Sequence, residues 1–319
     1  MRIARIEIGG APRAALVSAD GESAQLLPRE LDVLAVLTAS ADERAQMAAR
    51  AEAEVSLAQV HLLAPVQPPT VRDFSVFEQH IEGVRMLGGQ RRVPEVWYES
   101  PFCYFSNPHA VNGPGAQIAV PPGCRELDFE LEVACVIGRA GSNLAPEEAS
   151  AHIAGYTIFN DWSARDLQLA EMRLGLGICK GKDFANTLGP WIVTPDELEP
   201  HRIGDRYDLQ MRAQVNGREL GSDTLANMAW GFEELVSYAS RGTWVRPGDV
   251  LGSGTCGSGC LLELWGRHGR EYHRPLEAGD TVSLTVQGIG TLTNQVTAGP
   301  ELIRLPRARP RPRRSPSHS

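Results

Sequence analysis

Two acidic residues, Glu130 and Glu132, stand at the start of an apolar stretch of the chain. The residues that follow, Val-Ala-Cys-Val-Ile over 133–137, are typical of a buried strand. Side chains two positions apart on a strand point to the same face, so the two carboxylates lie side by side and Asp128 continues their row. Such carboxylates repel each other and lose hydration, and they persist where a cation neutralises them. Oxygen ligands alone select a hard ion, Mg²⁺, Mn²⁺ or Ca²⁺, rather than zinc.

An isolated Glu-x-Glu pair is more often the solvent-facing side of an amphipathic strand, so a third carboxylate matters. Asp161 directly follows a strand expected over 155–160. If a helical turn begins at Asp161, Arg165 and Gln168 share its face at i+4 and i+7. An arginine can then form two hydrogen bonds with a substrate carboxylate while the glutamine binds a neighbouring oxygen. On the residues alone, a helix-capping Asp paired with an Arg explains the pattern equally well. Lys182 lies in a glycine-containing loop, where a lysine is usually a solvated charge.

The elements that must position these residues fall into two parts. Residues 1–66 predict a small N-terminal accessory domain, with short strands up to residue 27 and a helix from a capping box at 40–43 to about residue 56. Residues 67–303 predict a catalytic domain that is mainly β, of the α+β class, with antiparallel or mixed sheets. The Arg/Pro/Ser-rich segment 304–319 predicts a disordered tail. Strands are expected over 101–105, 117–120, 130–138, 156–160, 191–193, 209–215, 261–265 and 281–286, and helices over 146–153 and 230–240.

Charge and composition exclude several classes of partner. The chain has 31 basic and 39 acidic side chains, and this net negative charge disfavours nucleic acid and anionic lipid. No stretch approaches the roughly 20 apolar residues that cross a bilayer. The six cysteines contain no Cys-x-x-Cys pair, so we expect reduced thiols and a cytoplasmic location. An anionic substrate must therefore be bound by a few cations inside a pocket.

Four blocks of the chain resemble the fumarylacetoacetate hydrolase family, and the similarity covers about residues 70 to 295. They are Leu-Asp-Phe-Glu-Leu-Glu over 127–132, Asn-Asp-Trp-Ser-Ala-Arg-Asp-Leu-Gln over 160–168, Gly-Lys-Asp-Phe over 181–184 and Arg-Asp-Phe-Ser-Val-Phe-Glu-Gln-His over 72–80. The resemblance implies one divalent cation per subunit, Mg²⁺ first and Mn²⁺ or Ca²⁺ as alternatives. It implies that Glu130, Glu132, Asp161 and Asp73 are the metal ligands and that Arg165 and Gln168 bind the substrate. It also implies that Lys182 stabilises negative charge and that His80 activates water.

Three further assignments follow from the same resemblance. Relatives supply a glutamate that orients the histidine, either from a later loop or from beside the histidine. The matching loop here, 252–260, has no glutamate, so Glu78 and Glu82 are the candidates, with Glu78 assigned. Tyr104 and Thr255 match substrate-contacting positions.

The resemblance also implies a fold and an activity. The fold is a mixed β-sandwich or β-roll with a small N-terminal domain, usually in a homodimer. The expected activity is hydrolysis of a C–C bond in a small anionic 1,3-dicarbonyl or 2-oxo acid, similar to fumarylacetoacetate or an acylpyruvate, as in the breakdown of aromatic compounds. A metal-dependent lyase or isomerase, such as an oxo-acid decarboxylase or a dienoate hydratase, would use the same site. A non-catalytic metal-containing binding protein is the alternative outside enzymes.

Overall fold

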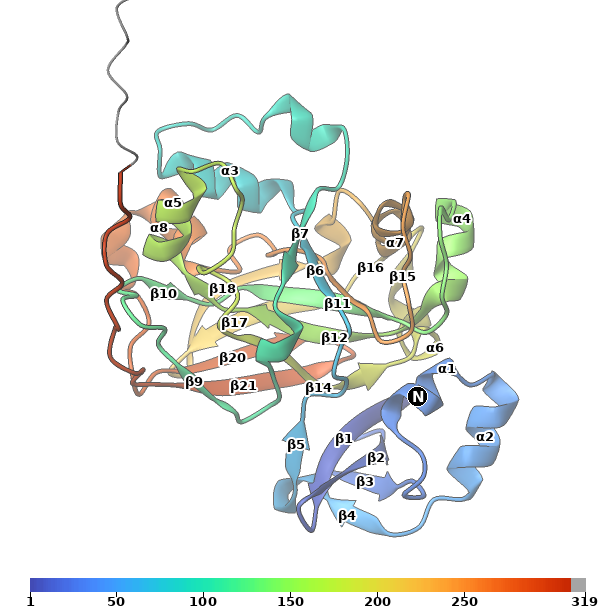
Figure 1. The fold of residues 1–319 in the computed structure, drawn as a ribbon. Coiled ribbons are helices and arrows are strands. Elements are labelled where there is room, and N and C mark those ends of the chain that lie inside the picture. The colour runs from blue at the N-terminus through green and yellow to red at the C-terminus, as the bar shows by residue number, and fades with distance from the viewer. Residues whose placement is uncertain (311–319) are drawn as a thin grey trace, which may run out of the picture.

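The larger of the two main sheets forms the frame of the protein. The computed structural model describes residues 1–310, and residues 311–319 lie outside the described part. The sheet runs in the order β4-β3-β2-β1-β14-β12-β11-β19-β6-β7, with β5 paired to β1 and β8 paired to β14 (Figure 1). Its strands are β1 Arg2–Ile8, β2 Ala11–Val17, β3 Ser23–Leu26, β4 Glu54–Ser56, β5 His61–Leu63, β6 Val71–Phe74, β7 Cys103–Ser106, β8 Val111–Asn112, β11 Leu131–Ile137, β12 Ile153–Asp161, β14 Asn186–Val193 and β19 Val250–Gly252.

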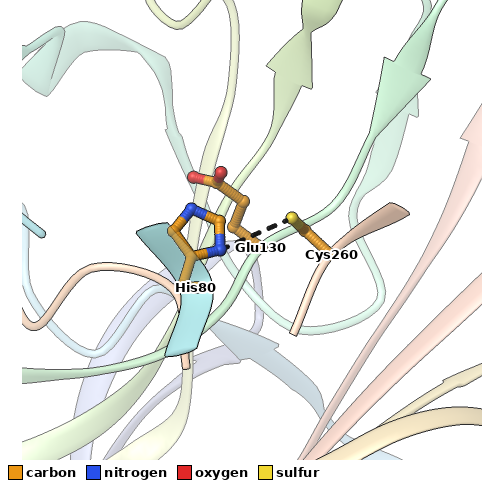
Figure 2. Close-up of side chains that lie close together, drawn as sticks. All are labelled: His80, Glu130 and Cys260. Atoms are coloured by element: carbon orange, nitrogen blue, oxygen red, sulfur yellow. Dashed lines mark hydrogen bonds between the residues drawn. The ribbon is translucent and has the colours of Figure 1, made fainter. Parts of the chain in front are cut away.

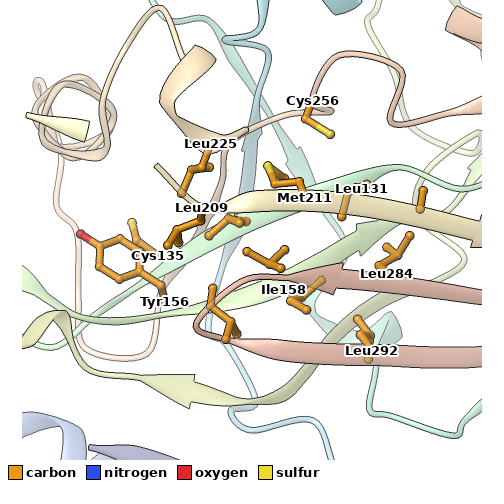
Figure 3. Close-up of a cluster of buried hydrophobic side chains, with 14 of the residues drawn as sticks. Leu131, Cys135, Tyr156, Ile158, Leu209, Met211, Leu225, Cys256, Leu284 and Leu292 are labelled. Carbon is orange, nitrogen blue, oxygen red and sulfur yellow. The ribbon is translucent and has the colours of Figure 1, made fainter. Parts of the chain in front are cut away.

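A second sheet packs against the middle of the first. Its order is β18-β17-β20-β21-β9, from β9 Gln117–Ala119, β17 Gln210–Val215, β18 Arg218–Thr224, β20 Thr281–Val286 and β21 Gly290–Thr297. Two short pairs complete the strands, β10 Leu127–Asp128 with β13 Ser163–Ala164, and β15 Arg202–Ile203 with β16 Arg206–Tyr207. Residues of both sheets, among them Leu131, Ile158, Met211 and Leu284, form the hydrophobic core between them (Figure 3).

Strand β11 is buried along its whole length, which explains its continuous apolar sequence. Leu131, Val133 and Cys135 point into the core between the two sheets. The alternate residues Ala134 and Val136 belong to a second core on the opposite face of the large sheet. The strand alternation therefore places Glu130 and Glu132 on the face away from the second sheet.

The helices cover the ends and edges of the sheets. They are α1 Val33–Thr38, α2 Ala41–Ala49, α3 Glu78–Met86, α4 Pro146–Ala149, α5 Arg165–Met172, α6 Pro195–Leu198, α7 Phe232–Ser240 and α8 Leu261–His268. Figure 1 shows α3, α5 and α8 gathered over one end of the sheets, while α1 and α2 lie with β1–β5 in a separate lobe. Within the described residues, no helix combines the length and the hydropathy that crossing a bilayer requires.

The N-terminal lobe is joined to the rest by a strand pair. In β1, Arg2 and Ile3 pair with Val193 and Ile192 of β14, so the lobe extends the large sheet. The boundary expected at residue 66 stays a prediction. Residues 304–310 have no regular structure and are exposed, and the remainder of the expected tail, 311–319, lies outside the described residues.

The mainly β, mixed-sheet architecture expected from the sequence is confirmed, and three local predictions are corrected. The helix predicted up to residue 56 ends at Ala49, and β4 follows it. The segment 261–265, predicted as a strand, is the first part of helix α8. A short apolar run is typical of a buried strand, but here the side chain of Cys260 caps the start of a helix. The helical turn considered at Asp161 is absent, because β12 continues through Asp161 and α5 begins at Arg165.

Candidate active site

Four carboxylates converge at one end of the large sheet. Asp73 lies on β6, Glu132 on β11 and Asp161 on β12, and Glu130 directly precedes β11. One oxygen of each of the four lies within 4.8 Å of the others, and all four side chains are buried. Strand β19 separates β6 from β11, and its Gly252 pairs with Asp73 on one side. A side chain at Gly252 would collide with the Asp73 carboxylate, so the glycine leaves the space in which the carboxylates meet.

Cationic and neutral donors hold part of this cluster in place. The Lys182 ammonium group lies 2.5 Å from Asp161 Oδ2 and also pairs with Glu130. Asn186 Nδ2 donates to Asp161 Oδ1 at 2.7 Å, and the Tyr104 hydroxyl donates to Asp161 Oδ2. The backbone N–H of Gly254 donates to both Asp73 and Glu132, at 3.2 and 3.0 Å.

Asp73 and Glu132, in contrast to Glu130 and Asp161, have no cationic side chain paired with them among the described residues. Glu132 Oε1 is fully buried and has no hydrogen-bond partner among the described residues. Burial, with the neighbouring Asp161, raises the pKa of Asp73 to about 7, and burial raises the pKa of Asp161 to about 6. Burial and Asp73 raise the pKa of Glu132 well above its ordinary value. Burial acts in the same direction on Glu130, but Lys182 and Arg165 outweigh it and lower the pKa of that carboxyl group.

A divalent cation fits this arrangement. Four converging carboxylates with an unpartnered buried oxygen form the oxygen-only donor set that hard ions take. The donor set contains no sulfur or imidazole, so its chemistry matches Mg²⁺ or Mn²⁺ rather than zinc. Asp73, Glu130, Glu132 and Asp161, the four residues expected to bind metal, are therefore brought together by the fold.

We expect a divalent cation to stabilise the protein more at high pH than at low pH. The metal-free folded state binds protons at Asp73 and Asp161 up to about pH 7 and 6, whereas these groups in the unfolded chain lose their protons near their ordinary pKa of 3.8. Because the folded state then holds more protons, its stability falls as the pH rises through this window, and a bound cation offsets the loss. Thermal unfolding with and without Mg²⁺ should show a larger increase in Tm at about pH 8 than at about pH 5.5. An increase that is the same at both pH values would contradict the assignment of Asp73 and Asp161 as ligands.

All three nitrogens of the Arg165 guanidinium group donate hydrogen bonds to other side chains of the protein. Its Nε donates to Asp128 at 2.8 Å, its Nη2 to Glu130 at 2.7 Å, and its Nη1 to Gln168 Oε1 at 3.1 Å. Asp128 also accepts the backbone N–H groups of Leu261 and Leu262, which begin α8. The spacing of Asp128 suggested that it would join the row of carboxylates. Its carboxylate instead connects Arg165 to the N-terminus of α8.

His80 is paired with Glu263 and not with either of the expected candidates, Glu78 and Glu82. Its Nδ1 lies 3.2 Å from Glu263 Oε2. Glu263 also accepts from Arg267 Nε at 2.7 Å and from the backbone N–H of Ser258 at 2.8 Å, so its orientation is fixed from three sides. Figure 2 shows the imidazole ring between Cys260, whose Sγ lies 3.9 Å from Nδ1, and the carboxylate of Glu130.

Close packing of α3 on α8 produces this pair. A side chain at Gly266 of α8 would overlap the backbone of Gly83 on α3, and one at Gly83 would overlap Glu263. The two glycines therefore allow the helices to approach closely enough for His80 and Glu263 to meet.

Glu78 does not occupy the position beside His80 that was assigned to it. Its partly exposed carboxylate accepts a hydrogen bond from the Tyr98 hydroxyl. Residues two apart on a helix point in nearly opposite directions, so Glu78 and His80 cannot share a face of α3. Glu263 follows the glycine-rich loop 252–260 by three residues and lies in the segment that was predicted as a strand but forms the start of α8.

A pocket of about 350 Å³ opens beside the four carboxylates. Its lining includes the remaining candidate residues His80, Tyr104, Arg165, Gln168, Lys182 and Thr255. Asp73 and Glu130 of the carboxylate cluster also line it, and Phe74, Val84, Phe102, Ile178 and Leu262 supply apolar surface. The structure thus gathers every predicted substrate-binding residue around one cavity.

Glu171 holds the loop that carries Lys182. Its carboxylate accepts three backbone N–H groups, those of Cys179, Lys180 and Gly181, at 2.8, 2.7 and 2.9 Å. Gly181 also packs directly on Gln168, where a side chain would collide with the backbone of α5. These contacts fix the loop next to Lys182, which explains how a lysine in a loop becomes buried.

Comparison with known proteins places this geometry in one family. Residues 70–297 match the model for the fumarylacetoacetate (FAA) hydrolase C-terminal domain. The chain is 31% identical over 245 residues to the oxaloacetate tautomerase YisK of Bacillus subtilis, covering 76% of this chain and 74% of that protein.

Solved structures with different activities have the same fold. The 5-carboxymethyl-2-hydroxymuconate delta-isomerase of Mycobacterium smegmatis superposes with a TM-score of 0.69 and 29% identity, over 93% of this chain and 100% of that one. The fumarylacetoacetate hydrolase of Exiguobacterium antarcticum gives a TM-score of 0.73 and 27% identity, over 93% and 99% of the two chains. The matched region contains all four converging carboxylates, His80 and Lys182, and the chain belongs to the fumarylacetoacetate hydrolase family.

Proposed function

We propose that this protein is a divalent-metal-dependent hydrolase that cleaves a C–C bond in a small anionic 2,4-dioxo acid. The observation that supports hydrolysis is the His80–Glu263 pair at the edge of the pocket, 3.2 Å between Nδ1 and Oε2. A bound divalent cation would polarise the oxygens of the substrate's dioxo group and stabilise negative charge on them. Asp73, Glu130, Glu132 and Asp161 would hold that cation, with Mg²⁺ or Mn²⁺ as the matching ions.

His80 is in a position to act as a general base. A carboxylate beside Nδ1 favours the tautomer with the proton on that nitrogen, and Nε2 is then free to accept a proton from water. The water oxygen adds to the carbonyl carbon, the adjacent C–C bond breaks, and its electron pair forms an enolate on the oxo-acid fragment. Protonation of the enolate carbon completes the reaction and yields two carboxylic acids.

Lys182 supports the second half of this sequence. Its buried ammonium group pairs with Glu130 and Asp161 and lines the pocket. These carboxylates raise its pKa above the ordinary value for lysine, against the effect of burial, so it stays protonated at neutral pH. A fixed positive charge in a site shielded from water stabilises a developing enolate strongly.

Isomerisation or tautomerisation of an oxo acid is the alternative. YisK is named an oxaloacetate tautomerase and the Mycobacterium smegmatis protein a delta-isomerase, and both activities pass through an enol or enolate. Such a reaction needs the cation and Lys182 but no hydrolytic water, so the role of His80 separates the two proposals.

A direct assay distinguishes the candidate activities. Purified protein with Mg²⁺ or Mn²⁺ is incubated with 2,4-dioxo acids, a fumarylacetoacetate analogue and enol-oxaloacetate, with EDTA as a control. We expect metal-dependent release of two carboxylic acids from each molecule of a dioxo acid, detected by NMR and abolished by EDTA. Accelerated loss of enol-oxaloacetate without any C–C cleavage would favour the tautomerase. Cleavage that continues in EDTA would refute the metal-dependent mechanism.

A further inference from the structure

The basic side chains of the active-site pocket are already paired with carboxylates. Among the described residues that line it, the basic ones are His80, Arg165 and Lys182. Lys182 lies between Glu130 and Asp161, and Arg165 between Glu130 and Asp128. His80 is directed to Glu263. No lining side chain in the described part of the chain therefore offers a free positive charge to a second carboxylate of a substrate.

The charge of the site reinforces this point. The four metal-facing carboxylates and Asp128 carry five negative charges when ionised. Lys182, Arg165 and a divalent cation together supply four positive charges, so one net negative charge remains. The chain as a whole is also acidic, with a formal net charge of −8. A distal carboxylate on the substrate would be repelled by this site rather than neutralised by it.

Apolar side chains from several segments contribute to the lining of the same pocket. Val84 lies one helical turn beyond His80 on α3, so both side chains share a face, and Leu262 directly precedes Glu263 on α8. Phe102 is two residues before Tyr104, and its side chain is about half exposed, at 48%. Ile178 lies next to the segment that Glu171 holds through three backbone hydrogen bonds. Four separate segments of the chain thus bring apolar side chains to the lining of the pocket.

We infer that the distal arm of the substrate is uncharged and apolar, so that the protein acts on 2-oxo or 2,4-dioxo acids with an alkyl or aryl end rather than on dicarboxylates. This inference rests on the proposed function for the identity of the dioxo acid head group. An apolar arm gains from leaving water for the surface formed by Val84, Phe102, Ile178 and Leu262. A carboxylate in the same place loses its hydration and finds no cation.

A matched pair of ligands tests the inference without requiring turnover. 2-Oxohexanoate and 2-oxohexanedioate have the same chain length and the same 2-oxo acid head, but end in a methyl group and in a carboxylate. Isothermal titration of the Mg²⁺-loaded protein should give a Kd for 2-oxohexanoate lower by about tenfold or more. The corresponding pair of 2,4-dioxo acids should show the same preference in kcat/KM. Equal affinities, or tighter binding of 2-oxohexanedioate, would overturn the inference.

A charge introduced into the wall should reverse the preference. Ile178→Lys places a cation at the pocket, and we expect it to improve binding of 2-oxohexanedioate and weaken that of 2-oxohexanoate. Leu176→Lys is the matched control, because Leu176 lies on the same loop but outside the pocket lining and is 84% exposed. The control should keep the wild-type ratio. Phe102→Lys, at the half-exposed position, provides a second test if Ile178→Lys does not fold.

The outcomes separate this inference from the proposed hydrolysis. Preference for 2-oxohexanoate without C–C cleavage of any dioxo acid would support the apolar arm and refute the hydrolase. Cleavage of both dioxo acids with equal kcat/KM would support the hydrolase and refute the apolar arm. A Leu176→Lys variant that shifts the ratio as much as Ile178→Lys would show that general surface charge, and not the pocket wall, determines the preference, which also refutes it.

Discussion

His80→Ala is expected to lower kcat for C–C hydrolysis by about 10²- to 10⁴-fold, because it removes the general base. The imidazole lines the pocket and is paired with Glu263 through Nδ1, so its loss leaves no base fixed in that position. The four side chains that we expect to bind the cation are all carboxylates, so His80 does not belong to that set. Stabilisation of the variant by Mg²⁺ in thermal unfolding should therefore remain close to that of the wild type.

The Glu263→Gln variant provides a graded comparison. Glutamine keeps the shape and one acceptor oxygen but removes the charge that favours a proton on Nδ1 of His80. We expect a smaller decrease in kcat than for His80→Ala, and little further decrease when the two substitutions are combined, because both act through one base. Hydrolysis by His80→Ala at the wild-type rate would remove His80 from the mechanism. If His80→Ala loses hydrolysis but keeps tautomerase activity, the cation and Lys182 are sufficient to stabilise the enolate.

Lys182→Met is expected to reduce both activity and stability. Lys182 is buried between Glu130 and Asp161, and its removal leaves both carboxylates without their cationic partner. Loss of one member of a buried ion pair typically costs about 3–5 kcal/mol of folding free energy. Loss of a positive charge that stabilises an enolate should lower kcat about 10²- to 10³-fold, in hydrolysis and in tautomerisation alike.

Lys180→Met is the control for that variant. Lys180 lies in the same loop, but its side chain is 75% exposed and pairs with Asp183 at the surface. It should leave kcat and Tm almost unchanged, because exposed ion pairs contribute little. Added Mg²⁺ should recover part of the Tm lost in Lys182→Met, since a cation can neutralise the same carboxylates, whereas kcat should not recover. Full recovery of kcat would mean that the lysine only balances charge.

Local spacing predicts part of the carboxylate cluster for a clear physical reason, whereas Asp73 was expected only from the family resemblance. Glu130 and Glu132 share a strand face by the two-residue period alone, and Asp161 ends the neighbouring strand. The buried apolar run after Glu132 also predicted that the carboxylates would be deprived of water, which the structure shows. The mixed β architecture followed in the same way from the alternation of short strands and turns.

Long-range packing decided what local patterns could not. Glu263 meets His80 because Gly83 and Gly266 allow α3 and α8 to touch, although 183 positions separate the pair in sequence. Asp128 has the spacing of a metal ligand, yet its carboxylate accepts hydrogen bonds from Arg165 and from two backbone N–H groups at the start of α8.

Spacing along the chain therefore predicts the strand framework and the kind of ion that its carboxylates can hold, because both depend on neighbours in the chain. The folded chain is needed to show which glutamate pairs with His80, which cationic side chains are already neutralised and which apolar residues line the pocket. Those properties depend on distances between elements that are far apart in the sequence.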